Sequence, residues 1–252
     1  MRPVLLLLIC SLCLTLPGCG GPAASNHAPP EAPSEPPDTD LAADDAGEPV
    51  VMPEGPTAPE PFAEDFSDAA FIGDSRTEGL QLHAGLSEAD FFTDVGLMVN
   101  EALTEDKLPL PDGTRGTALE ALSGRTYRRI YLMFGVNELG WDADSVFKDD
   151  YAALIQAIQE VQPEAVVYAQ TIFPVTREKS EGDRTYNNDN VRRFNDRVRE
   201  AAEETGAVLI ETAALFDDGA GNLPAEVSAD GVHLTHSYYL QWLDYLREVS
   251  VP

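Results

Sequence analysis

Short apolar runs alternate with amphipathic helical segments along residues 62–252, and this alternation limits the fold more than any other feature of the sequence. Apolar runs separated by helices are typical of parallel strands whose sheet is covered by helices on both faces. The pattern predicts a sheet of about five strands. They lie at residues 69–72, 129–134, 165–172 and 207–211, with a second short strand or a strand-to-loop junction at residues 93–99. Because ligands bind beyond the carboxyl ends of strands in open parallel sheets, functional residues are expected directly after these runs.

Amphipathic helices are predicted where apolar residues recur three or four positions apart. Between the third and fourth strands these residues are Phe147, Tyr151, Leu154, Ile155, Ile158 and Val161. Between the fourth and fifth strands they are Val191, Phe194, Val198 and Ala202. A closing helix carries Trp242, Tyr245 and Leu246. Strands and helices together indicate one α/β domain over residues 62–252, a usual length for one domain.

The first 19 residues have the features of an export signal. Arg2 supplies a positive charge, residues 4–16 form an apolar stretch, and the stretch ends in Leu16-Pro17-Gly18-Cys19. This ending resembles the bacterial lipobox, although Pro17 is atypical, and the resemblance implies that Cys19 is acylated and becomes the mature N-terminus. The protein is then expected on the extracytoplasmic face of the cell membrane, held by its lipid alone. Secretion without a lipid is the alternative.

Residues 20–61 are predicted to be a disordered tether. They contain eleven prolines, nine acidic residues and no Lys or Arg. Such a segment buries too little apolar surface to offset the chain entropy lost on folding, and proline with like charges keeps it extended.

Charge and cysteine content exclude several classes of protein. The chain has 16 basic and 44 acidic residues, a formal net charge of −28, so nucleic acid is not an expected partner. No apolar run reaches the roughly 20 residues of a membrane-spanning helix. All cysteines lie at Cys10, Cys13 and Cys19, so the predicted domain has no disulfide, cysteine nucleophile or thiolate metal site.

Two segments at opposite ends of the domain suggest hydrolytic chemistry. The first predicted strand runs into Gly73-Asp74-Ser75, which places a serine hydroxyl at the start of a helix. Asp230 and His233 stand three residues apart after the last strand. Serine hydrolysis needs an imidazole that accepts the hydroxyl proton and a carboxylate that orients the imidazole, and one short loop would supply both. Asp230, His233 and His236 also have the spacing of a metal site, but Gly231 favours a loop, with His236 exposed in the first turn of the last helix.

Two further strand ends carry groups suited to binding an oxyanion. Gly96 follows the second predicted strand, and Gly135-Val136-Asn137 follows the third. A backbone N–H and a side-chain amide at neighbouring strand ends are able to converge on one developing negative charge.

These four blocks resemble, in order, those of the SGNH (GDSL-type) hydrolase family. The resemblance implies a flavodoxin-like three-layer α/β/α sandwich, with Ser75 as nucleophile, His233 as base and Asp230 as its orienting carboxylate. It also implies an oxyanion hole formed by Ser75, Gly96 and Asn137, and no metal or other cofactor. Arg76 stands where the family usually has leucine, and Glu138 where it commonly has aspartate, and both are expected to change the charge of the pocket.

The resulting functional expectation is a metal-free serine ester hydrolase that acts on small acyl esters, such as O-acetyl groups of envelope or environmental glycans. An O-acetyltransferase with the same triad is one alternative, and a non-catalytic glycan-binding lipoprotein is another. The segment from Phe173 to Asn188 is expected to be a long polar loop that forms either a substrate wall or a surface excursion.

Overall fold

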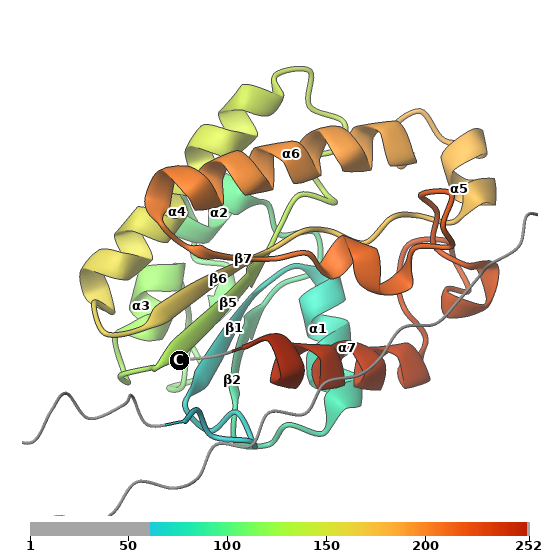
Figure 1. Ribbon diagram of the computed structural model, residues 1–252. Helices are drawn as coiled ribbons and strands as arrows, with labels where there is room; N and C mark the ends of the chain where they lie inside the picture. Colours follow the sequence, from blue (N-terminus) through green and yellow to red (C-terminus); the bar gives the residue numbers. More distant parts are fainter. Residues whose placement is uncertain (1–60, 251–252) are drawn as a thin grey trace, which may run out of the picture. The chain divides into compact units, whose positions relative to one another are not determined.

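The computed structural model describes residues 61–250, in which five parallel strands form one sheet (Figure 1). The strands are β1 (Ala69–Gly73), β2 (Asp90–Thr93), β5 (Arg129–Met133), β6 (Val166–Gln170) and β7 (Val208–Ile210). Their order across the sheet is β2-β1-β5-β6-β7. The chain therefore moves from β1 to one side, returns past it, and continues on the other side. This reversal is the doubly wound order in which ligands bind beside the first strand.

Helices cover both faces of the sheet, so the predicted three-layer α/β/α arrangement is confirmed (Figure 1). One layer contains α1 (Ser75–Ala84) and α7 (His236–Val249), which pack against each other. The other layer contains α2 (Val99–Thr104), α3 (Ala118–Leu122), α4 (Asp144–Val161) and α6 (Asn188–Thr205).

Shorter elements fill the connections. They are the hairpin β3 (Leu108–Pro109) and β4 (Arg115–Gly116), helix α5 (Arg177–Gly182), and the 3-10 turns at Thr212–Phe216 and Ala225–Val227. Within residues 61–250, no helix is long and apolar enough to cross a membrane.

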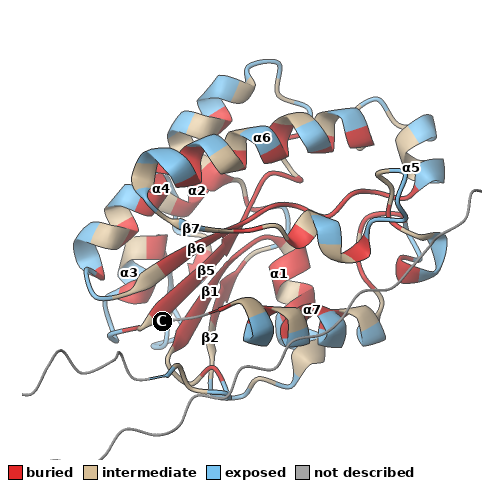
Figure 2. Ribbon diagram, in the orientation of Figure 1, coloured by how far each residue is buried: buried red, intermediate tan, exposed pale blue. Residues whose placement is uncertain are grey.

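The predicted apolar faces of the long helices are buried. In α4 the buried set is Phe147, Tyr151, Leu154, Ile155 and Ile158, while Val161 at the end of the helix is exposed. The four predicted positions of α6 are all buried. In α7, Trp242 and Leu246 are buried and Tyr245 is half-buried. Figure 2 shows the result, with buried strands at the centre and helices whose outer faces are exposed.

Of the two interpretations of residues 93–99, the strand was wrong and the strand-to-loop junction is confirmed. The strand itself occupies Asp90–Thr93. Phe91 and Phe92 are buried, whereas Val95 is 67% exposed and Leu97 N–H donates to the Asp94 carbonyl in a turn. Because Asp90 is charged, the start of this strand does not stand out as an apolar run in the sequence. In the fold this carboxylate accepts a hydrogen bond of 2.8 Å from the Tyr127 hydroxyl.

An aromatic row fixes the register of the sheet. Phe91, Phe71, Tyr131 and Tyr168 are register partners on four neighbouring strands, and their rings stack with centroids 4.7, 4.7 and 4.9 Å apart. A slip of one residue would turn each ring to the opposite face of the sheet, so this row resists a change of register. The same register places the end of β1 beside the end of β5, with Gly73 opposite Met133.

Candidate active site

The serine lies where β1 passes into α1, and the local sequence explains its position. A Cβ on Gly73 would lie 2.7 Å from the Met133 carbonyl oxygen, so only glycine allows this close approach of β1 and β5. Asp74 caps α1, with its Oδ1 accepting the Arg76 N–H at 2.9 Å. Ser75 is then the first residue of α1, where the backbone N–H has no partner within the helix and the helix dipole is positive.

The structure brings Ser75, His233 and Asp230 together across 158 residues of sequence. Ser75 Oγ lies 2.9 Å from His233 Nε2, and His233 Nδ1 lies 2.7 Å from Asp230 Oδ2. Because an ionised carboxylate only accepts hydrogen bonds, Nδ1 carries the ring proton and Nε2 is left to accept the Ser75 hydroxyl proton.

Hydrogen bonds keep the Asp230 carboxylate ionised. Partial burial opposes ionisation, but hydrogen bonds from the His233 backbone and ring and from the Val232 backbone together hold its pKa well below the ordinary value. Asp230 Oδ1 accepts both backbone N–H groups at 2.8 Å. Gly231, between Asp230 and Val232, adopts φ +84°, and a Cβ there would meet Thr176 and Lys179 at 2.8 Å. The loop that holds the carboxylate is therefore pressed against the start of α5.

The predicted oxyanion groups are only partly brought together. Asn137 follows β5 and lines the same cavity as Ser75, and its side-chain amide donates to the Leu97 carbonyl at 3.0 Å. Gly96 lies in the exposed turn after β2 with φ +78°, and it is not among the residues that line this cavity. The Asn137 bond nevertheless links the cavity to the residue directly after Gly96.

Glu138 and Arg76 are expected to change the charge of the pocket, but neither side chain is among the residues that line it. Both side chains are completely buried. Glu138 Oε1 accepts the Val99 N–H at 2.7 Å, and burial raises the pKa of Glu138 to about 8. Arg76 Nη1 donates to the Phe173 carbonyl at 2.9 Å. Glu138 therefore joins the segment after β5 to the start of α2, and Arg76 joins the start of α1 to the segment after β6.

A cavity of about 210 Å³ lies beside the serine. Its lining includes Lys179 and Tyr186, two residues that sequence reasoning did not select. Both belong to the predicted loop after β6, which contains α5 and forms one wall of the site. Lys179 Nζ lies 3.0 Å from the Asp183 carboxylate and 5.1 Å from the centre of the Tyr186 ring. No spacing pattern identified these residues, because only the folded segment brings them to the serine.

His236 does not join His233 and Asp230. It is exposed at the start of α7, as predicted, and its Nδ1 contacts His83 Nδ1 at 3.2 Å. In residues 61–250, no group of three or more His, Cys, Asp or Glu side chains is arranged to share a metal ion. Cys19 and the predicted signal and tether lie outside the described residues.

Comparison with known proteins gives one family match and several similar folds. The sequence profile of the GDSL-like Lipase/Acylhydrolase family matches residues 71–239. A proposed platelet activating factor from Streptococcus pneumonia superimposes with a TM-score of 0.57 at 22% identity, over 72% of this chain and 82% of that one. A proposed SGNH hydrolase from Slackia heliotrinireducens gives 0.54 at 21% identity, over 71% and 96% of the two chains. Among curated proteins, no sequence matches.

Proposed function

The chain belongs to the GDSL-like Lipase/Acylhydrolase family, and from this premise we propose that it is a serine hydrolase of small acyl esters, including O-acetyl groups on glycans. The observation that carries the proposal is the continuous hydrogen-bonded series from Ser75 Oγ through the His233 ring to Asp230, at 2.9 and 2.7 Å. These groups supply a nucleophile, a base and an orienting carboxylate, so the reaction needs no metal or other cofactor.

In the proposed reaction, Ser75 Oγ attacks the ester carbonyl while His233 Nε2 takes its proton. The Ser75 N–H and the Asn137 amide stabilise the oxyanion, and the Gly96 N–H is the third donor that the family resemblance implies. His233 then donates the proton to the leaving alcohol, which departs from an acyl-enzyme at Ser75. Water attacks this intermediate with His233 again acting as base, and the carboxylic acid is released.

The size of the cavity supports a short acyl group. A volume of about 210 Å³ is below the roughly 300 to 1,000 Å³ of pockets that enclose drug-sized ligands. Val136 and Val232 offer a small apolar contact, whereas Lys179 and His233 border the cavity with polar groups. An acetyl or similarly short group fits these surroundings better than a long hydrocarbon chain.

We expect kcat/KM on a series of p-nitrophenyl esters to be highest for acetate and to fall at least about tenfold by octanoate, because added methylenes must leave the small cavity. The measurement is initial rates on esters of two to twelve carbons, with Ser75→Ala as the blank. Fastest hydrolysis of octanoate or longer esters would contradict the short-acyl proposal.

We also propose that Cys19 carries a lipid that holds the enzyme on the outer face of the cell membrane. The support is the apolar stretch and lipobox-like ending of the first 19 residues. Replacing Cys19 by alanine is expected to move the protein from the membrane to the soluble fraction, because the acidic residues 20–61 have no affinity for the membrane. Fractionation and mass spectrometry of the mature N-terminus test this. A wild-type protein that is soluble and unlipidated would favour simple secretion.

A further inference from the structure

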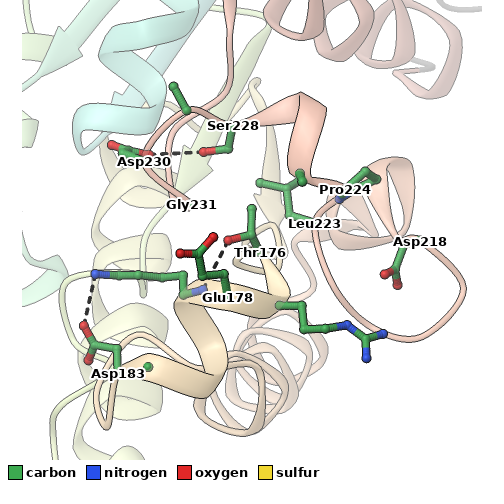
Figure 3. A pocket seen from close by; sticks show the side chains of 14 residues that line it. Thr176, Glu178, Asp183, Asp218, Leu223, Pro224, Ser228, Asp230 and Gly231 are labelled. Atoms are coloured by element: carbon green, nitrogen blue, oxygen red, sulfur yellow. Dashed lines mark hydrogen bonds and ion pairs between the residues drawn. The ribbon is translucent and has the colours of Figure 1, made fainter.

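A second cavity, of about 790 Å³, adjoins the serine site and shares Lys179 and Asp230 with it (Figure 3). We infer that this groove binds the alcohol part of the ester, and that it suits a neutral, hydroxyl-rich alcohol such as an oligosaccharide. The inference rests on the proposed ester hydrolysis and adds where the leaving group lies and which segments select it.

The groove adjoins the small cavity at Lys179 and Asp230, the two residues that line both. The leaving oxygen must take its proton from His233 Nε2, which faces Ser75 in the small cavity. With the acyl group next to Asn137 and Val136, an alcohol too large for the small cavity extends past Lys179 into the groove. The two cavities thus match the two halves of an ester.

Hydrogen bonds to the backbone hold the two walls of the groove together without a bound substrate. One wall is formed by residues 176–183, which include α5, and the other by residues 218–231. Thr176 N–H donates to the Gly231 carbonyl, and Leu223 N–H donates to the Val175 carbonyl, both at 3.0 Å. The buried Asn188 side chain bonds both polar groups of the Val175 backbone, at 2.8 and 2.9 Å. Such preorganisation lowers the entropy cost of binding.

The chemistry of the lining favours hydroxyl groups over hydrocarbon or anions. Eight of its fourteen residues carry polar or charged side chains, and Figure 3 shows Thr176 and Glu178 on one wall and Leu223 and Pro224 on the other. The charged groups are the cations Arg177 and Lys179 and the carboxylates Glu178, Asp183, Asp218 and Asp230, which sum to −2. An alcohol that carries a carboxylate or phosphate would be repelled.

Two glycines allow a matched test. Gly182 lines the groove, whereas Gly124 precedes the amino end of the central strand β5. A Cβ on either glycine would meet nothing within 4 Å. For Gly182→Phe, we expect kcat/KM on a neutral acetylated xylo-oligosaccharide to fall at least about tenfold, and to fall more than kcat/KM on p-nitrophenyl acetate, whose smaller alcohol reaches less of the groove. Gly124→Phe should change neither value. Wild-type enzyme should prefer the neutral oligosaccharide to an acetylated oligogalacturonide.

Different outcomes separate this inference from the proposed function. If wild type hydrolyses p-nitrophenyl acetate but Gly182→Phe keeps full activity on the oligosaccharide, or loses both activities equally, the leaving group does not lie in the groove. Preference for the anionic oligosaccharide would also overturn the inference. Failure of wild type on every acetyl ester would instead refute the proposed function. If Gly182→Phe does not fold, Ala225→Trp in the groove and Ala153→Trp on the exposed face of α4 give the same comparison.

Discussion

Replacement of Ser75 by alanine is expected to lower kcat for ester hydrolysis by about 10⁴ to 10⁶, the usual cost of removing the nucleophile from a serine triad. The hydroxyl oxygen lies 2.9 Å from His233 Nε2, the nitrogen proposed to take its proton. Steady-state rates on p-nitrophenyl acetate and labelling by a fluorophosphonate measure the loss, and labelling should disappear completely.

The fold should survive this change. The Ser75 side chain is only half-buried and its hydroxyl bonds a ring that is itself 42% exposed, so the melting temperature is expected to stay within about 3 °C of wild type. A folded variant that retains more than about a tenth of the activity would refute the role of Ser75 as nucleophile.

Replacement of His233 by alanine is expected to cost a similar factor of about 10⁴ to 10⁶ in kcat, because the serine then has no base within hydrogen-bond reach. The ring is 42% exposed, so its removal leaves a space that opens to solvent. Added imidazole should enter this space and raise the kcat of His233→Ala at least about tenfold. The measurement is kcat of His233→Ala with and without imidazole, with Ser75→Ala as the control that imidazole does not rescue.

Asp230→Asn provides the comparison within the triad. Asp230 orients the ring and stabilises its charged form, so its loss should lower kcat about 10- to 100-fold less than the loss of His233. An Asp230→Asn variant more impaired than His233→Ala, or a His233→Ala variant with near wild-type activity, would contradict this division of roles.

The sequence by itself determined the layer architecture and most of the elements. Apolar periodicity located four of the five strands to within one or two residues at most ends, and it located the buried faces of α4 and α6. Periodicity suffices there because burial of those side chains decides both the local structure and the place of the element in the core. The sequence also selected Ser75, Asp230 and His233, because their positions after strands can be recognised from the local sequence. In a doubly wound sheet the carboxyl ends of the strands lie at one side, so residues that follow different strands come close together.

The tertiary structure alone decided the surroundings of these residues. Arg76 and Glu138 directly follow the Ser75 and Asn137 blocks in the sequence, yet both side chains are buried and bond the backbone at Phe173 and Val99 instead of lining the pocket. Side-chain direction and burial at such positions depend on which segments pack above them, and sequence spacing does not encode this.

The same holds for the groove. Residues 173–188 have the composition of a polar loop, but contacts with residues 218–231 turn them into a wall that carries Lys179 to the serine. The bonds from Thr176 to Gly231 and from Leu223 to Val175 join segments about fifty residues apart, and they form only after the sheet has brought those segments together. Local propensity determined the strands and helices. Long-range hydrogen bonds between loops determined the shape of the site, because the sequence of a loop has no apolar periodicity that specifies which segment it will contact.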